Sequence, residues 1–232
     1  MLSFDHSIIL YLNGLFPHSV IIGRLVEIIC SSNIFKGQIF MAFFWWVWFR
    51  QQEEEIVRRD RKIVLLTLLG VLVALFIVRV LIITVPFRFR PLDDPNIVFR
   101  LPFTFIPAVG KWSSFPSDHA ALFTGLAVSF WFINRRLFFI VVAYVIVVIL
   151  LPRLFLGLHY PTDLIAGAVL GVACVLLSLK LFMNIPLLEA TLDWADEHKG
   201  LFYSLFFFLT AQLADLFDDV RYIGGMIIKL LH

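Results

Sequence analysis

The segment between Pro152 and Asp163 contains residues whose types and spacing suit nucleophilic chemistry. His159 and Asp163 stand four residues apart, and Pro161 lies at a natural helix start, so the Asp163 carboxylate can orient the His159 imidazole. An oriented, neutral imidazole acts as a nucleophile or a base. Arg153 adds a planar guanidinium, the side chain whose donors match phosphate oxygens. This combination predicts phosphoryl transfer.

Two further groups of polar residues complete the inventory, one at Phe115–His119 and one at Phe87–Pro91. Ser117 adds a hydroxyl at a predicted helix N-terminus, where free amides and the helix dipole favour an anion. His119, in the first turn of that helix, could protonate a leaving oxygen. Arg90 brings a second guanidinium. Two arginines, two histidines, a serine and a helix end predict a phosphoryl-transfer site that uses no metal and no cofactor.

The composition shows what kind of protein must position these side chains. The chain has 232 residues, of which 61% are apolar and only 16% charged, with a net charge of +2. Ordinary soluble domains are about 45–50% apolar and about 25% charged. The composition excludes a disordered chain, a nucleic-acid binder and a secreted disulfide scaffold. Cys30 and Cys174 lie far apart in apolar stretches and indicate neither a disulfide framework nor a metal site. A polytopic membrane protein remains.

Continuous apolar segments predict the membrane spans, because a transmembrane helix needs roughly 20 apolar residues. The sequence therefore predicts an all-α, polytopic membrane helix bundle of about five to six transmembrane helices with N-terminal surface helices. A sixth span is weakened by Gln212 and Asp215. The expected spans are 34–50, 63–86, 118–133, 137–156, 161–183 and, as the sixth, 201–217.

The two ends of the chain differ from this core. Polar residues interrupt the apolar segment 1–33, which we interpret as two short helices at the membrane surface and not as a cleaved signal. Residues 1–183 then form the catalytic membrane domain, with 34–183 as its transmembrane core. Residues 184–232 form an amphipathic and hydrophobic appendage. Within it, 187–199 mixes apolar and acidic residues, as in an amphipathic helix packed on the cytoplasmic face.

Basic residues in short connections predict the orientation in the membrane. The loop 50–62 contains five of them, and the turn 134–136 adds two arginines on the same side, which should be cytoplasmic. The 87–117 loop and the turn at 157–161 then lie on the opposite, extracytoplasmic side of the cell (inner or plasma) membrane. This topology brings all three polar groups of residues to one end of the bundle, where polar groups at membrane depth indicate function.

At these residues the sequence resembles the type 2 phosphatidic acid phosphatase (PAP2) superfamily. Its motifs are Lys-x6-Arg-Pro, Pro-Ser-Gly-His and Ser-Arg-x5-His-x3-Asp. The third motif appears as Pro152-Arg153-x5-His159-x3-Asp163 and the second as Pro116-Ser117-Asp118-His119. The first keeps only Arg90-Pro91. The resemblance covers about residues 34 to 183.

The resemblance implies a role for each matching residue. His159 would attack phosphorus and form a phosphohistidine, with Asp163 holding its ring. His119 would protonate the departing oxygen. Arg90, Arg153 and Ser117 would stabilise the equatorial oxygens, an electrostatic effect worth several kcal/mol of barrier.

Three positions depart from the family pattern. Ile83 stands where the family has its lysine, and Arg79, Arg88 and Lys111 are possible substitutes for it. Asp118 replaces the usual glycine, so its carboxylate would repel a phosphate, pair with an arginine or handle a proton. Pro152 replaces the serine before Arg153 and removes a donor.

The resemblance implies a membrane enzyme that removes phosphate from a lipid phosphate or pyrophosphate, of the polyprenyl or phosphatidyl type. Its partners would be that substrate and membrane lipids, with no nucleic acid. The Asp118 and Pro152 variants also look like an inner-membrane branch that transfers phosphate from undecaprenyl pyrophosphate to lipid A. A third alternative, from another class, is a non-catalytic transporter or scaffold whose arginines bind anionic lipid head groups.

Overall fold

The computed structural model describes residues 2–15, 19–105, 112–220, 223 and 226, and no strand occurs in these ranges. Six apolar helices lie where the sequence predicts spans. Those at Glu54–Thr84, Arg135–Phe155 and Pro161–Phe182 are long and apolar enough to cross a membrane, whereas Ile34–Phe49, Asp118–Ile133 and Lys199–Ala214 are shorter. The prediction of an all-α membrane bundle is confirmed.

Most helices follow one another with short connections, but a long segment that contains only η2 joins Thr84 at the end of α4 to Asp118 at the start of α5. Some spans contain irregular turns: the first begins with the π-helix η1, and α6, the π-helix η3 and α7 form one continuous helix. The elements are α1 (Leu2–Leu15), α2 (Val20–Ser31), η1 (Ile34–Gln38), α3 (Ile39–Phe49), α4 (Glu54–Thr84), η2 (Pro91–Asp93), α5 (Asp118–Ile133), α6 (Arg135–Tyr144), η3 (Val145–Leu150), α7 (Leu151–Phe155), α8 (Pro161–Phe182), α9 (Pro186–Glu197) and α10 (Lys199–Ala214).

Local sequence explains where several helices begin. The Ser117 side chain caps α5 by accepting a hydrogen bond from the amide of Ala120. The side chain of Asn134 accepts from two amides at the start of α6, so the chain reverses between α5 and α6 in a single residue. Pro161 and Pro186 occupy the first turns of α8 and α9, where a missing amide proton costs nothing.

Helices α4, α5 and α8 form the centre of the bundle, and small residues let them approach closely. A Cβ atom at Gly171 of α8 would lie 1.9 Å from the carbonyl oxygen of Ala121 in α5. A Cβ at Gly167 would lie 2.3 Å from the carbonyl oxygen of Ser117. Glycine is therefore required where α8 crosses the first turns of α5. This contact holds the start of α8 beside the start of α5, and each of these helix starts carries polar residues.

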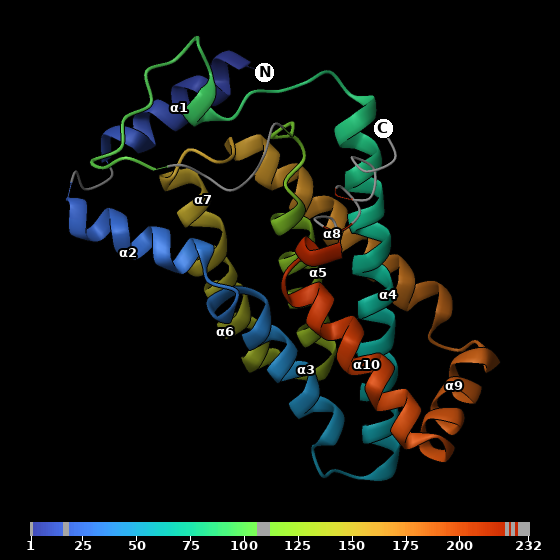
Figure 1. The fold of residues 1–232 in the computed structure, drawn as a ribbon. Coiled ribbons are helices and arrows are strands. Elements are labelled where there is room, and N and C mark those ends of the chain that lie inside the picture. Colours follow the sequence, from blue (N-terminus) through green and yellow to red (C-terminus); the bar gives the residue numbers. More distant parts are fainter. Residues whose placement is uncertain (1, 16–18, 106–111, 221–222, 224–225, 227–232) are drawn as a thin grey trace.

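The outward faces of the long helices remain apolar, as expected for contact with lipid. Large exposed side chains on α4, α6 and α8 include Phe76, Ile83, Phe139, Val169 and Leu181. Figure 1 shows α1 and the segment after α4 at one end of the molecule, and the α3–α4 turn with α9 at the other. The polar residues of interest lie at the α1 end.

The charged segment expected as a loop at 50–62 is largely helical, because α4 already begins at Glu54. Its basic residues are neutralised by acidic partners: Arg58 pairs with Glu189 and Asp193 of α9, and Arg50 pairs with Asp60. Helix α9 also buries an apolar face through Leu188 and Leu192. The predicted amphipathic helix is thus present, and ion pairs attach it to α4.

The predicted N-terminal helices are α1 and α2. Helix α1 contacts α7 and α8 at the end of the bundle that carries the polar residues. The last described helix, α10, packs on α3 through Trp45 and Trp48, whose indole groups donate to Thr210 and Tyr203. The assignment of 1–183 and 184–232 to two parts stays a prediction.

Candidate active site

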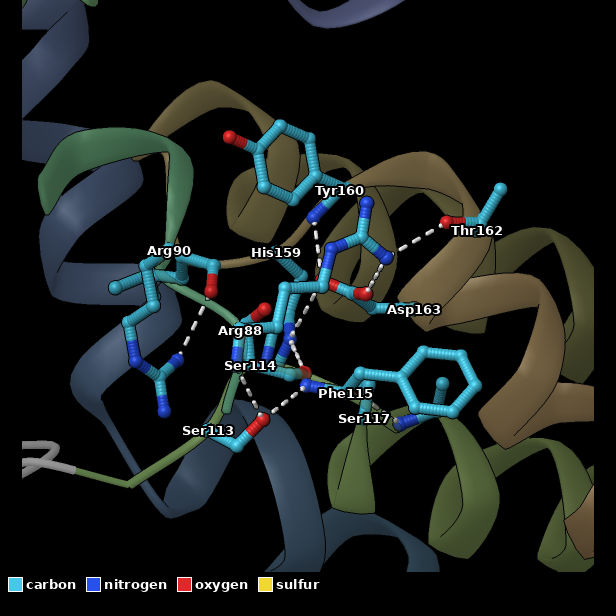
Figure 2. A network of polar contacts seen from close by, with 12 residues as sticks. Arg88, Arg90, Ser113, Ser114, Phe115, Ser117, His159, Tyr160, Thr162 and Asp163 are labelled. Carbon is cyan, nitrogen blue, oxygen red and sulfur yellow. Dashed lines mark hydrogen bonds and ion pairs between the residues drawn. The ribbon is translucent and has the colours of Figure 1, made fainter. Parts of the chain in front are cut away.

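The His159 imidazole is buried and held by one hydrogen bond. Its Nδ1 lies 2.9 Å from the main-chain carbonyl oxygen of Ser114. A carbonyl oxygen only accepts, so Nδ1 carries the proton and Nε2 keeps its lone pair. The Asp163 carboxylate lies 3.8 Å from the same Nδ1 atom, which is too far for a hydrogen bond. The ring is therefore oriented by the Ser114 carbonyl, with the Asp163 carboxylate nearby (Figure 2).

Asp163 is itself fixed by two donors. One oxygen accepts from the amide of Tyr160 at 2.8 Å and completes the N-terminal cap of α8. The other accepts from the guanidinium of Arg88 at 2.5 Å. Asp163 is fully buried, so this pairing satisfies a carboxylate that water does not reach. Its predicted role of holding the His159 ring stays a prediction.

Arg88 links the site to the N-terminal helix. Its guanidinium donates to Asp163, to Thr162 at 2.9 Å and to Asp5 of α1 at 2.5 Å, and it lies over the ring of Tyr160. Figure 2 shows Arg88 directed at Thr162 and Asp163. Two carboxylates already neutralise this cation. Arg88 is thus placed to position Asp163 more than to bind phosphate.

Three residues that sequence reasoning missed form a second polar cluster beside His159. The Asp94 carboxylate accepts from the Tyr160 hydroxyl at 2.6 Å and lies 3.1 Å from the His6 ring of α1. Burial, together with the hydrogen bond to Asp94, raises the pKa of Tyr160 above its usual value. Burial alone would raise the pKa of Asp94, yet hydrogen bonds from Tyr160 and Asn96 hold it below its usual value. No spacing pattern marks these residues, because His6 and Asp94 are 88 positions apart.

The first turn of α5 carries a second oriented histidine. The Nδ1 atom of His119 lies 2.8 Å from the carboxylate of the neighbouring Asp118. The other oxygen of Asp118 accepts from Arg79 of α4 at 2.9 Å. Of the three alternatives for Asp118, the geometry supports pairing with an arginine. It also adds contact with a histidine, so this carboxylate is already neutralised.

Ser117 and the two remaining arginines surround these histidines. The Ser117 hydroxyl is buried at the cap of α5. Arg90 donates to the carbonyl of Leu158 at 2.9 Å, and its buried Nε has no hydrogen-bond partner among the described residues. Burial lowers the pKa of Arg90 below its usual value, although the carboxylates of Asp118 and Asp163 oppose that effect. An arginine side chain nonetheless remains charged.

Arg153 is likewise buried and donates to the main-chain carbonyl of Ile149 at 2.5 Å. Neither Arg90 nor Arg153 forms an ion pair within the described part of the chain, whereas Arg79 and Arg88 both do. Two kinds of arginine therefore meet at this end of the bundle. One pair holds carboxylates in place, and the other pair has a positive charge left for an anion.

Electrostatic interactions show that the predicted groups converge. Asp118 interacts with both His119 and His159. Arg90 interacts with Asp118, Asp163 and Arg153. Of the possible lysine substitutes, Arg79 and Arg88 lie at the site but are ion-paired, and Lys111 lies outside the described residues. No group of three or more His, Cys, Asp or Glu side chains in the described ranges could hold a metal ion.

A comparison with protein-family profiles shows the family to which this chain belongs. The PAP2 superfamily profile matches residues 68–186, just over half of the chain. The chain belongs to the PAP2 superfamily. The matched range contains Arg90, Ser117, His119, Arg153, His159 and Asp163.

Two curated proteins are similar to part of this PAP2 chain. A lipid A 4'-phosphatase of Bacteroides thetaiotaomicron is 36% identical over 88 residues, which cover 36% of this chain and 38% of that protein. The bacitracin transport permease protein BcrC of Bacillus licheniformis is 34% identical over 96 residues, which cover 38% of this chain and 44% of that protein. The matched segment thus spans less than half the length of each relative. No solved structure shows significant similarity.

Proposed function

We propose that this protein is a membrane phosphatase that removes phosphate from a lipid phosphate or pyrophosphate at the extracytoplasmic face. The observation that carries the proposal is the meeting of two oriented histidines, His159 buried and His119 partly buried, with two buried arginines that lack a carboxylate partner among the described residues. Membership of the PAP2 superfamily and the resemblance to a lipid A 4'-phosphatase support it.

In the proposed first step, the Nε2 lone pair of His159 forms a bond to phosphorus as the bond from phosphorus to the lipid oxygen breaks. His119, held by the Asp118 carboxylate, gives a ring proton to the departing oxygen. Arg90, Arg153 and the Ser117 hydroxyl bind the phosphoryl oxygens while negative charge shifts. Each group is held before substrate arrives, so little reorganisation is needed at the moment of reaction.

In the second step, water attacks the phosphohistidine. His119 takes a proton from that water, the bond between phosphorus and the His159 nitrogen breaks, and inorganic phosphate leaves. A second lipid in place of water would give a phosphotransferase. Water and lipid as acceptors are therefore two outcomes of one intermediate.

We propose that an apolar groove, none of whose lining residues belongs to the polar site, holds the lipid chain of the substrate. It has a volume of about 410 Å³ and lies between α3 and α6. Its walls are apolar side chains, so an acyl or polyprenyl chain would replace membrane lipid there without losing hydrogen bonds. The lining residues are Ile39, Ala42, Phe43, Trp46 and Leu137.

The test is release of inorganic phosphate from a panel of lipid phosphates and pyrophosphates in mixed micelles, without added divalent metal. We expect turnover by the wild type and none by His159→Ala. The matched control is His198→Ala, because His198 is exposed at the α9–α10 junction, and it should keep full activity. Turnover surviving in His159→Ala would refute the mechanism.

Two further outcomes separate the alternatives. Phosphate transferred to an added lipid acceptor, with little free phosphate, would indicate a phosphotransferase. Binding of anionic lipid without turnover by the wild type would indicate a transporter or scaffold, the class to which the name of the second relative refers.

A further inference from the structure

Lys36 is a buried cation in an apolar helix. It lies in η1, at the start of the apolar segment Ile34–Phe49, and only 8% of its surface is exposed. A lysine near a helix end in a membrane ordinarily extends its amino group to water. This one does not. Within the described part of the chain, its amino group forms no hydrogen bond or ion pair, although removing an ammonium from water is costly without a counter-charge.

Ring contacts place Lys36 at the level of His119. One turn after Lys36, Phe40 packs against Phe123 of α5 with ring centroids 5.3 Å apart. The ring of His119, one turn before Phe123, lies 6.2 Å from that of Phe123. Helices α3 and α5 run in the same direction (Figure 1). The side chains one turn before these contacts, Lys36 and His119, therefore lie at the same end of the bundle.

Its electrostatic neighbours include two residues of the candidate active site, besides Cys30 and Asp218. Lys36 interacts with Arg153 and Asp118, and His119 interacts with both Arg153 and Lys36. Asp118 is already occupied by Arg79 and His119. Asp218, the other acidic neighbour, is exposed.

The position of Lys36 is imposed by packing from two sides. A Cβ atom at the adjacent Gly37 would lie 2.0 Å from the carbonyl oxygen of Ala214, so the end of α10 presses directly on η1. On the other side, η1 contacts η3, and the Tyr144 hydroxyl donates to the carbonyl of Phe35 at 2.5 Å. Packing from both sides thus holds this buried cation in place.

Two buried cations without a carboxylate partner repel each other unless an anion lies between them. We propose that Lys36 is a phosphate-binding residue of the active site and acts together with Arg153. This inference rests on the proposed function for the identity of the anion. It supplies a cation where the first motif lacks one, since Ile83 is 72% exposed on the outer face of α4 and cannot serve.

The inference is tested with Lys36→Met, which keeps the length of the side chain and removes its charge. Inorganic phosphate is the probe, both as a product inhibitor of turnover and as a ligand that raises the thermal midpoint. We expect the phosphate inhibition constant and KM to rise roughly 10- to 100-fold, the loss expected for one hydrogen bond to a charged group. Lys36→Arg should recover part of this loss.

The thermal midpoint without phosphate separates binding from folding. It should stay equal or rise in Lys36→Met, because the variant removes a buried, uncompensated charge. Lys180→Met is the matched control, since Lys180 is an exposed lysine on α8 and should leave every quantity unchanged. If Lys36→Met does not fold, Lys36→Gln gives the same comparison.

The two proposals fail in different ways. An unchanged phosphate inhibition constant in Lys36→Met would overturn the role of Lys36 while leaving the phosphatase intact. Absence of turnover in the wild type would overturn the proposed function. In that case, loss of the phosphate-induced rise in thermal midpoint in Lys36→Met would still support Lys36 as an anion ligand, and its retention would overturn that assignment.

Discussion

The first prediction concerns Asp5 of the N-terminal helix α1. We expect a change at this residue to alter both the stability of the fold and the activity of the site. Its carboxylate is fully buried and accepts from Arg88 at 2.5 Å, from the Thr162 hydroxyl at 2.5 Å and from the Thr162 amide at 3.3 Å. Asp5→Asn keeps the shape and one acceptor oxygen but removes the charge. Arg88 then keeps only Asp163 as a counter-charge.

The magnitude follows from these contacts. A hydrogen bond to a charged group contributes about 1.5–3 kcal/mol, and breaking a buried ion pair costs about 3–5 kcal/mol. Since asparagine retains part of the bonding, we expect a loss of about 2–4 kcal/mol in the free energy of unfolding. For a chain of this size, that corresponds to a fall in Tm of roughly 5–15 °C. Released from Asp5, Arg88 also shifts Asp163, and kcat should fall roughly 10- to 100-fold.

The assay pairs thermal unfolding, followed by tryptophan fluorescence in detergent, with phosphate release from the best substrate of the panel. Asp196→Asn is the matched control, because the Asp196 carboxylate is half-exposed and lies 3.4 Å from Arg61 in a surface pair. Such pairs contribute about 0–1 kcal/mol. The reasoning is refuted if Asp5→Asn keeps both Tm and kcat within the range of this control.

Three further perturbations test the packing, the groove and the polar cluster around Asp94. Gly171→Ala should lower both Tm and activity, because its Cβ would meet the Ala121 carbonyl and push α8 away from α5. The control Gly200→Ala has open space around it and should change neither quantity. Equal effects of the two substitutions would contradict the packing argument. Ala42→Trp should fill the groove and raise KM for long-chain lipids but not for a short-chain soluble analogue, and a uniform change would exclude the groove. The pKa of the Asp94 carboxyl is lower in the folded protein than in the unfolded chain, where it is about 3.9. The ionised carboxylate therefore stabilises the fold at a pH above about 3.9, and this stabilisation is lost as the pH falls through the pKa of the folded state. The difference in Tm between wild type and Asp94→Asn, measured from pH 7 downward, should therefore shrink in acid, and a constant difference would count against it.

Local sequence patterns predict most of the helices and the positions of the main site residues. Apolar runs show the helices because each run must cover about 30 Å of membrane without exposing its backbone. The third motif places His159 and Asp163 on either side of a helix start, and the start of α8 is where sequence reasoning puts it. The charged segment from Glu54 was harder to assign, because its helix is stabilised by ion pairs to α9 far along the chain.

The sequence by itself determined which residues are available for phosphoryl transfer and which end of the bundle carries them. Only the tertiary structure decided how those residues divide. Arg79 and Arg88 pair with carboxylates, whereas Arg90 and Arg153 form no ion pair among the described residues. The His159 ring forms its hydrogen bond with the Ser114 carbonyl. The tertiary structure also brings Asp5 to Arg88 from a helix outside the motifs. The physical reason is the distance along the sequence between interacting residues. The spacing of residues in a sequence shows which side chains are neighbours within one or two helical turns. Ion pairs also form between helices that are far apart in the sequence, and these depend on which helices pack together.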